Sequence, residues 1–233
     1  MLAVTDLCSG YGPIRVLNRL SLTVKAGEFV GILGHNGMGK STLLKTLIGL
    51  IPTTSGQIRF DGADVTMAPP HRRARLGIGY VPQGRGILPG LTVRDNLLFA
   101  AAALNKPADQ LDAVLDDFPR LKNLLARPGG ALSGGEQQLL ALARTLIQNP
   151  RIVLLDEPTE GIQPSIIEEI IDLLKELRIR RNLTVLLVEQ NIDFIRGLSD
   201  RVLLIQRGAI VSELSVSQLT DSTAMGDFSG VAH

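Results

Sequence analysis

The sequence predicts an α/β fold: a mostly parallel sheet with flanking helices, antiparallel strands at the front and a helical insertion subdomain. Apolar runs of strand length alternate with helical patterns along much of the chain. Between Gly84 and about Arg127 the pattern is purely helical, which indicates the insertion. One apolar run leads into a glycine-rich loop and then a helical pattern, an order typical of phosphate-binding α/β proteins.

Composition limits the possible classes of protein. The 233 residues are enough for one large domain or for one domain with an insertion. Hydrophobic residues make up 45% of the chain and tryptophan is absent, so we expect an aliphatic core with strands buried on both faces. A net charge of +1 gives no field for nucleic acid, and no nucleic-acid partner is expected. The cluster of Arg72, Arg73 and Arg75 is expected to lie on a solvated helix face.

The expected elements follow in chain order. Antiparallel strands at the front are predicted over Leu2–Leu7, Val16–Val24 and Gln57–Phe60. Core strands are predicted over Phe29–Leu33, Gly79–Pro82, Ile152–Asp156, Thr184–Val188 and Val202–Gln206. Helices of the insertion are predicted over Asn96–Leu104, Ala108–Asp117 and Arg120–Ala126, with Pro128–Gly130 as the return linker. Residues 1–233 are therefore expected to form one domain, in which 1–83 and 150–233 make the α/β core and 84–149 the helical subdomain.

The glycine-rich loop fits the phosphate-binding pattern G-x-x-x-x-G-K-[ST] and predicts a P-loop NTPase core. Its glycines let backbone N–H groups point at a di- or triphosphate, and the following helix N-terminus adds positive potential. Lys40 supplies a charge for the β- and γ-phosphates, and Ser41 a hydroxyl for Mg²⁺. A glycine-rich turn that only caps a helix is the alternative. The loop residues are Gly34, His35, Asn36, Gly37, Met38, Gly39, Lys40, Ser41 and Thr42.

A second glycine-containing segment, Leu132–Gln138, precedes a helical pattern over Gln137–Gln148. A second helix N-terminus therefore lies next to a serine hydroxyl, which makes a second anion site. One chain has no evident need of two phosphate sites, whereas a head-to-tail dimer uses both. In isolation the same residues also fit a serine N-cap with glycines for the turn. The residues concerned are Ser133, Gly134, Gly135 and Glu136.

The run Ile152–Asp156 ends in two acids, Asp156 and Glu157. It is interpreted as a buried strand that delivers carboxylates at its C-terminal end, where open α/β sheets bind ligands. Asp156 can hold Mg²⁺ through water, and Glu157 can polarise the attacking water. An acidic strand end without chemistry is the alternative, and it is hard to combine with a phosphate loop on a neighbouring strand.

Three further residues are candidates for the same site. Gln83 follows the strand over Gly79–Pro82, so its amide can reach the metal or the attacking water; a plain turn residue is the alternative. Tyr11 lies in a Gly/Pro-rich loop, where it either stacks on adenine or covers the core. His35 is expected to face solvent or to bond to the backbone, because no cysteine or second histidine is spaced to complete a metal site.

The sequence favours the cytoplasm. Its one cysteine, Cys8, cannot form an internal disulfide. Its longest apolar block, Leu97–Leu104, is far shorter than the ~18 residues that a membrane span needs. Asp6 and the pair Ser9–Gly10 interrupt any apolar core near the start, so no signal peptide is expected. If the protein works at a membrane, we expect it to dock onto other subunits.

Together these segments resemble the ATP-binding subunits of ABC transporters over nearly the whole chain. By this resemblance Tyr11 is the adenine-stacking residue, Gly34–Thr42 the Walker A loop, Gln83 the Q-loop, Leu132–Glu136 the signature motif, Ile152–Asp156 the Walker B strand and Glu157 the catalytic carboxylate. The resemblance implies a Mg²⁺-dependent ATPase with the metal at Ser41, Gln83 and Asp156. It also implies that ATP lies between the Walker A loop of one subunit and Ser133, Gly134 and Gly135 of the other, so that hydrolysis lets the dimer part and drives membrane subunits.

Finer similarity points to importers of branched-chain amino acids and related small solutes. It is carried by residues 80–85, 91–93 and 187–191, and residues 156–165 look most like the urea or short-chain amide branch. Urea or short amides are therefore the expected cargo, with branched-chain amino acids second. One departure is Gln190, where the family usually has a histidine. Glutamine can hydrogen-bond a γ-phosphate but has no titratable proton near neutral pH, so we expect Gln190 to contribute positioning.

The resemblance also implies partners. These are ATP, a second copy or a paralogous ATPase subunit, two membrane permeases and, indirectly, a periplasmic solute-binding protein, with the chain peripheral on the inner face of the cell membrane. Ile87, Leu88 and Leu91 are expected either to dock the permease or to pack under the helical insertion. The rival classes are a soluble ABC ATPase without membrane partners and a P-loop kinase, which gives no reason for Leu132–Glu136.

Overall fold

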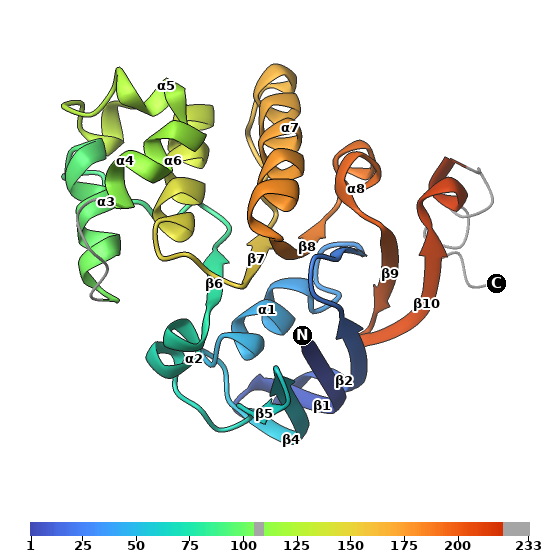
Figure 1. Ribbon diagram of the computed structural model, residues 1–233. Helices are drawn as coiled ribbons and strands as arrows, with labels where there is room; N and C mark the ends of the chain where they lie inside the picture. The colour runs from blue at the N-terminus through green and yellow to red at the C-terminus, as the bar shows by residue number, and fades with distance from the viewer. Residues whose placement is uncertain (105–109, 221–233) are drawn as a thin grey trace.

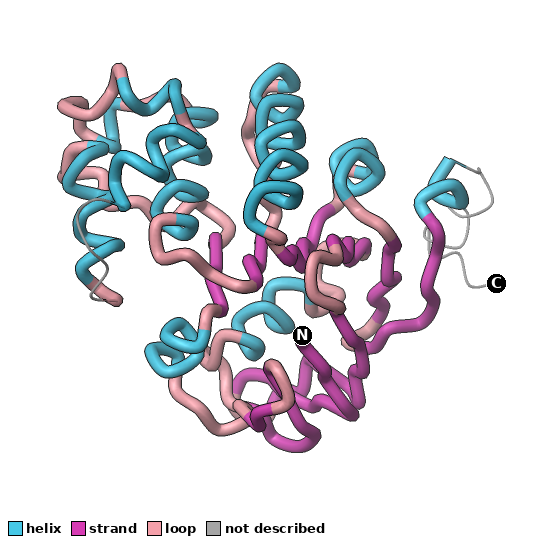
Figure 2. The backbone as a smooth tube through the Cα atoms, viewed as in Figure 1, coloured by secondary structure: helices cyan, strands magenta, loops and turns pink. Residues whose placement is uncertain are grey.

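The computed structural model describes residues 1–104 and 110–220. Two sheets, shown in Figures 1 and 2, form its framework: a four-stranded sheet in the order β2-β1-β4-β5 and a six-stranded sheet in the order β10-β9-β3-β8-β7-β6. The strands are β1 Leu2–Tyr11, β2 Ile14–Val24, β3 Phe29–Leu33, β4 Thr53–Phe60, β5 Ala63–Asp64, β6 Ile78–Val81, β7 Ile152–Asp156, β8 Thr184–Glu189, β9 Arg201–Gln206 and β10 Ala209–Ser215.

Helices cover both faces of the larger sheet. They are α1 Lys40–Leu47, α2 Pro70–Leu76, α3 Val93–Ala102, α4 Gln110–Asp117, α5 Pro119–Lys122, α6 Gly134–Leu146, α7 Pro164–Arg181 and α8 Ile192–Leu198, with 3-10 turns at Gly129–Ala131 and Val216–Thr220. Helices α3 to α6 gather beside the β6 edge of the sheet, and α1 lies between the two sheets (Figure 1). No helix in residues 1–104 or 110–220 is long and apolar enough to cross a membrane.

The larger sheet brings several strand ends to one edge. Its strands β9, β3, β8, β7 and β6 run parallel, and β10 joins the end of the sheet antiparallel to β9. The C-terminal ends of β3, β7 and β8 lie at Leu33, Asp156 and Glu189, so the segments that follow all begin at the same edge. Ligands of open α/β sheets bind at this edge, which is where Lys40, Gln83, Asp156, Glu157 and Gln190 lie.

Both faces of this sheet are buried in apolar side chains. In β3, Phe29 and Leu33 pack with residues of α6, α7 and α8, whereas Val30 and Ile32 pack with α1 and the antiparallel sheet. Strands β7 and β8 alternate in the same way. Burial on both faces explains why these strands are continuous apolar runs in the sequence.

The predicted fold class is confirmed, with differences at the ends of elements. The runs over Phe29–Leu33 and Ile152–Asp156 are strands with the predicted bounds, and the other predicted strands are found with shifted ends. Strands β5 and β10 were not predicted. The helix predicted from Ala108 is described only from Gln110, because residues 105–109 lie outside the described part of the chain.

The helix predicted over Arg120–Ala126 is wrong beyond Lys122, where α5 ends. The carbonyls of Leu125 and Arg127 instead accept hydrogen bonds from the first turn of α3, at 3.1 and 2.9 Å. These long-range bonds replace the carbonyl contacts that a continuing helix would make, so the segment leaves α5 as a series of turns.

The expectation of a solvated arginine face on α2 is wrong for Arg73, which is 2% exposed. Its guanidinium donates to the carbonyls of Thr46 and Leu47, both at 2.8 Å, at the C-terminal end of α1. It also donates to the carbonyls of Ala68 and Thr66, so four backbone carbonyls accept hydrogen bonds from the buried charge. A cation is favourable at a helix C-terminus, and Arg73 thereby fixes α2 against α1.

Candidate nucleotide-binding site

The loop between β3 and α1 has the backbone geometry of an anion-binding turn. Gly37 and Gly39 have φ angles of 80° and 101°, in the left-handed region that glycine adopts without steric cost. Gly39 is the N-cap of α1, so the first turn of the helix begins without a capping side chain. The N–H groups of that turn are therefore directed toward the loop, where they favour a negative ligand.

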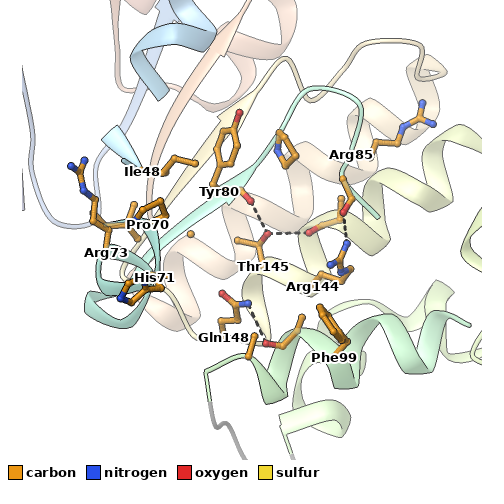
Figure 3. A pocket seen from close by; sticks show the side chains of 18 residues that line it. Ile48, Pro70, His71, Arg73, Tyr80, Arg85, Phe99, Arg144, Thr145 and Gln148 are labelled. Carbon is orange, nitrogen blue, oxygen red and sulfur yellow. Dashed lines mark hydrogen bonds between the residues drawn. The ribbon is translucent and has the colours of Figure 1, made fainter. Parts of the chain in front are cut away.

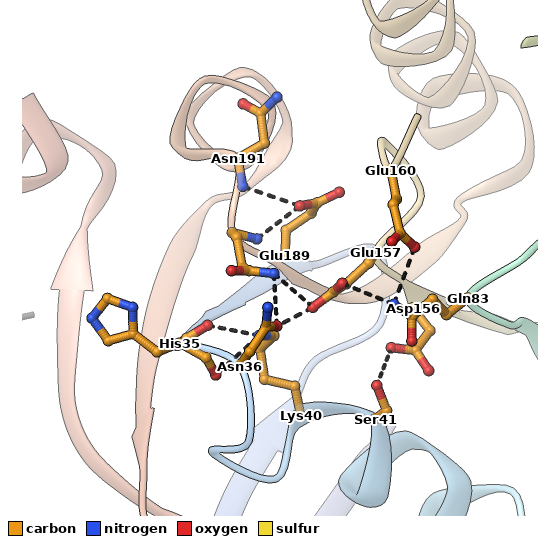
Figure 4. A network of polar contacts seen from close by, with 12 residues as sticks. His35, Asn36, Lys40, Ser41, Gln83, Asp156, Glu157, Glu160, Glu189 and Asn191 are labelled. Carbon is orange, nitrogen blue, oxygen red and sulfur yellow. Dashed lines mark hydrogen bonds and ion pairs between the residues drawn. The ribbon is translucent and has the colours of Figure 1, made fainter. Parts of the chain in front are cut away.

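Lys40 holds its ammonium group at the centre of this loop. The side chain is 4% exposed, and Nζ donates to the carbonyls of Gly34 at 2.7 Å and His35 at 3.2 Å. Nζ also lies 3.1 Å from Glu157 Oε1 in an ion pair. The ammonium therefore has a fixed position between the loop and the carboxylate (Figure 4).

Asp156 connects the end of β7 to α1. Its Oδ1 accepts a hydrogen bond from Ser41 Oγ at 2.8 Å, and its Oδ2 accepts one from Tyr80 Oη at 2.9 Å. Burial raises the pKa of Asp156, while the bonds from Ser41 and Tyr80 act in the opposite direction. Burial, together with the nearby Asp156 charge, raises the pKa of Tyr80, so the phenol remains a proton donor.

The carboxylate of Glu157 accepts hydrogen bonds from side-chain amides of two other segments. Gln83 Nε2 donates to Glu157 Oε2 at 3.3 Å and to Glu160 Oε2 at 3.1 Å. Gln190 Nε2 donates to Glu157 Oε1 at 3.2 Å and to Asn36 Oδ1 at 2.9 Å, which links the carboxylate to the phosphate loop (Figure 4). Glu157 itself has a φ angle of 47°, an uncommon conformation for a residue with a side chain.

A cavity of about 350 Å³ opens between these groups. It is lined by Val16, Asn36, Gly37, Gly39, Lys40, Ser41, Thr42, Gln83 and Glu157. Predicted site residues from three separate parts of the chain thus meet around one space. Tyr11 is not part of this lining; it is the last residue of β1 and is 49% exposed. His35 is exposed, as expected from the sequence.

The Ser133–Glu136 segment does not line the cavity of its own chain. Ser133 caps α6 in a capping box: its Oγ accepts a hydrogen bond from the N–H of Glu136 at 3.4 Å, and Glu136 Oε2 accepts one from the N–H of Ser133 at 2.8 Å. That backbone bond is the main reason why the pKa of Glu136 is lowered. Gly135 packs so closely that a Cβ would lie 2.8 Å from Ile166. The N-cap interpretation therefore describes the local structure within one chain.

The oxygen groups at the cavity and directly behind it fit Mg²⁺ better than a transition metal. Ser41 and Asp156 present a hydroxyl and a carboxylate in direct contact, and hard oxygen ligands of this kind suit Mg²⁺. In the described residues no group of three or more His, Cys, Asp and Glu side chains is arranged to hold a metal. The remaining ligands of a Mg²⁺ ion here would be phosphate oxygens and water, as is usual for this ion.

Sequence reasoning missed three residues at the site. Val16 lines the cavity, and Tyr80 donates a hydrogen bond to Asp156. The buried carboxylate of Glu189 accepts hydrogen bonds from the backbone of Thr159, two residues after Glu157, and from that of Gln190. Tyr80 carried a usable signal, because a tyrosine in an otherwise apolar strand next to the acidic strand needs a partner for its hydroxyl. The acid at position 189 also ends an apolar strand, as Asp156 does.

Residues 17–160 match the family model described as ABC transporter. The chain is 39% identical over 223 residues to a probable branched-chain amino acid transport ATP-binding protein, LivF, of Archaeoglobus fulgidus, covering 95% of this chain and 94% of the relative. It is 42% identical over 213 residues to the high-affinity branched-chain amino acid transport ATP-binding protein BraG of Pseudomonas aeruginosa, covering 91% of each.

A solved structure shares the fold over most of its length. It is the dimeric structure of a post-hydrolysis state of the ATP-binding cassette MJ0796 bound to ADP and Pi, with a TM-score of 0.82, 27% identity and coverage of 93% of this chain and 99% of that one. The length of the family match and the identity to both relatives agree with the site geometry. The chain belongs to the ABC transporter family, as one of its ATP-binding and ATP-hydrolysing proteins.

Proposed function

We propose that the chain is the ATPase subunit of an importer, and that it couples ATP binding and hydrolysis to uptake of a small solute. The observation that carries the proposal is the meeting of Lys40, Ser41 and Glu157 around one cavity, with Asp156 bonded to Ser41 directly behind it. A buried ammonium, a helix N-terminus and two carboxylates are the groups that phosphoryl transfer to water requires. We also propose that the chain consists of a nucleotide-binding α/β core, residues 1–83 and 150–233, and a helical subdomain, residues 84–149.

The site residues are assigned separate tasks. Lys40 and the loop Gly34–Thr42 bind the phosphates, and Ser41, Asp156 and Gln83 hold Mg²⁺, which would neutralise phosphate charge. Glu157 orients and activates the attacking water, and Gln190 positions Glu157 relative to the loop. Tyr11, exposed at the end of β1, stacks on adenine.

The active form is a head-to-tail dimer, either of two copies or with a paralogous subunit. In support, the Ser133–Glu136 turn lies away from the cavity of its own chain, and the related cassette MJ0796 is dimeric. The N-terminus of α6 then contributes its N–H groups to the nucleotide bound by the other chain.

Dimerisation is expected to depend on trapped Mg-ATP and on the Ser133 hydroxyl. Light scattering of the Glu157→Gln variant should report a monomer without nucleotide and a dimer with Mg-ATP, because phosphate charge is needed between two positive helix ends. Adding Ser133→Ala should weaken that dimer. The matched control is Thr92→Ala, which also removes an N-cap hydroxyl, that of α3, and should leave it intact. A dimer that forms equally well without nucleotide contradicts the proposal.

The groove between α2, β6, α3 and α6 is proposed to dock a permease helix (Figure 3). It has a volume of about 380 Å³, and Phe99 on its wall is 58% exposed. The segment around Ile87 and Leu88, predicted from sequence as the docking surface, is less suitable. Ile87 packs against the apolar core that includes α6 and α7. The backbone N–H and carbonyl of Leu88 both bond to the side chain of Asn96. An exposed aromatic beside a groove is more typical of a partner surface.

Phe99→Asp is therefore expected to abolish solute uptake in the assembled transporter while ATPase activity of the isolated chain stays within about 2-fold, because the charge disrupts an apolar contact outside the nucleotide cavity. Ile179→Asp is the matched control: Ile179 is 86% exposed on α7, away from the groove. Uptake assays in vesicles should separate the two variants. Equal uptake by both would contradict docking at this groove.

Branched-chain amino acids are the cargo class that we propose. The two relatives with 39% and 42% identity both carry branched-chain amino acid transport in their names. The preference for urea or short-chain amides drawn from residues 156–165 is not confirmed, and these solutes stay the second candidate. Consistent with such a role, the chain is proposed to be cytoplasmic and held at the inner face of the membrane by two permeases that receive solute from a periplasmic binding protein.

A further inference from the structure

Glu189 is a buried carboxylate at the end of β8, in the middle of the larger sheet. It is 3% exposed. Burying an ionised carboxylate is costly unless hydrogen bonds replace its hydration, so its partners explain why the chain places an acid here.

Four donors from two segments satisfy the carboxylate. Oε1 accepts hydrogen bonds from the backbone N–H of Thr159 at 2.9 Å and from its Oγ1 at 2.6 Å. Oε2 accepts bonds from the backbone N–H groups of Gln190 at 2.7 Å and Asn191 at 3.0 Å. Each oxygen thus serves one segment, and the carboxylate joins the two (Figure 4 shows the Oε2 side).

The two segments carry Glu157, which lines the cavity, and Gln190, whose side chain contacts it. Thr159 lies two residues after Glu157, whose own N–H donates to the carbonyl of Val188 at 3.0 Å. Gln190 follows Glu189 directly, and its side chain reaches Glu157. The backbone N–H of Glu157 is therefore bonded to Val188 in β8, and Thr159, two residues further on, is bonded to the Glu189 carboxylate. The same carboxylate fixes the backbone of Gln190.

We propose that Glu189 is a positioning residue for ATP hydrolysis: its two oxygens set the distance between the Glu157 carboxylate and the Gln190 amide. This rests on the roles proposed above for Glu157 and Gln190. Because Glu157 has a positive φ, its loop needs support from outside to keep that conformation. Glu189 supplies this support from outside the cavity, which its side chain does not line.

A purely structural role makes a different prediction. If Glu189 only satisfied buried N–H groups, its replacement would lower the melting temperature and leave the turnover of the folded enzyme unchanged. If it positions Glu157, turnover falls while the KM for Mg-ATP stays the same, because phosphate binding depends on the loop and Lys40.

The test is Glu189→Gln in the full-length chain. A glutamine has one acceptor oxygen in place of two, so either Thr159 or the Gln190–Asn191 pair loses its acceptor. We expect kcat at saturating Mg-ATP to fall by ~10-fold or more and KM to change by less than about 2-fold. In a Gln190→Ala background the same substitution should have a smaller effect, about 3-fold or less, because the two changes disturb one arrangement.

A second variant tests the same proposal if Glu189→Gln does not fold. Thr159→Val removes only the hydroxyl donor and keeps the carboxylate, so we expect kcat to fall by about 3-fold, and Thr159→Ser, which restores the donor, should recover it. The control is Glu28→Gln, which changes another carboxylate beside this sheet that accepts a backbone N–H, from Lys25 at 2.7 Å, and pairs with Arg201. It should lower the melting temperature and leave kcat unchanged.

The proposal is overturned if folded Glu189→Gln, as well as Thr159→Val, retains wild-type kcat, or if Glu28→Gln loses turnover to the same extent. The proposal is also overturned if the effects of Glu189→Gln and Gln190→Ala on kcat are fully additive in the double variant. Failure of the underlying roles has another signature: Glu157→Gln would then hydrolyse ATP normally, whatever the Glu189 variants do.

Discussion

Glu157→Gln is expected to lower the single-turnover rate of ATP hydrolysis by ~100-fold or more while nucleotide binding is retained. The amide keeps the size of the carboxylate but has one acceptor oxygen in place of two, so it keeps only one of the hydrogen bonds from Gln83 and Gln190, and it cannot accept a proton from water. Binding should be unchanged or tighter, because Lys40 loses the carboxylate that lies 3.1 Å from its ammonium and its charge becomes fully available to phosphate. Rapid-quench measurement at saturating Mg-ATP and equilibrium titration separate the two effects.

The matched control is Glu160→Gln. Glu160 is exposed and accepts a hydrogen bond from the same Gln83 amide, at 3.1 Å, but does not line the cavity. It should hydrolyse ATP within about 2-fold of the wild-type rate, as expected for a surface acid. If Glu160→Gln is the slower enzyme, the water-activating role belongs to Glu160 and the assignment made here is wrong.

Lys40→Met is expected to reduce Mg-ATP affinity by about 1.5–3 kcal/mol, the usual range for a hydrogen bond to a charged group. The substitution keeps an unbranched side chain in the buried position and removes the charge. It also leaves Glu157 without its ionic partner next to the incoming phosphates, so like-charge repulsion adds to the loss. Isothermal titration calorimetry of Lys40→Met and of the wild-type chain gives the change in affinity directly.

Lys45→Met serves as the control on the same helix. Lys45 lies in the last turn of α1 and does not line the cavity, so its loss affects the helix dipole and the charge near Asp156 but removes no group from the phosphate loop. Equal losses of affinity in Lys40→Met and Lys45→Met would mean that overall charge, and not the position of Lys40 in the loop, governs nucleotide binding.

Much of this site could be predicted from sequence because its residues follow strong local patterns. Strands β3 and β7 are continuous apolar runs, each ending in the groups that form the site, and their bounds came out as predicted. Because parallel strands end at one edge, the start of α1 and the end of β7 come together there, and Ser41 meets Asp156 although β8 lies between the two strands. The glycines of the loop carry their own conformational signal.

What the sequence did not provide were contacts between distant segments. Strand β10 has a mixed pattern because it lies at the sheet edge and is partly exposed, so no apolar run marks it. Helix α5 stops early because α3 binds the carbonyls that follow it. The burial of Arg73 depends on the end of α1, and that of Glu189 on Thr159, neither of which is near in sequence. Propensity and periodicity cannot report such partners.

The strand order of the larger sheet has a consequence for synthesis of the chain. Strand β3 is made early, yet both of its neighbours are made near the end: Phe29 pairs with Val185, and Val30 with Arg201. Until β8 and β9 leave the ribosome, an apolar strand with two unpaired edges stays exposed, which is an aggregation hazard. Closing a loop that contains the whole helical subdomain is also slow. The nascent chain should therefore depend on chaperones, and nucleotide can stabilise the fold only after nearly all of it has been translated.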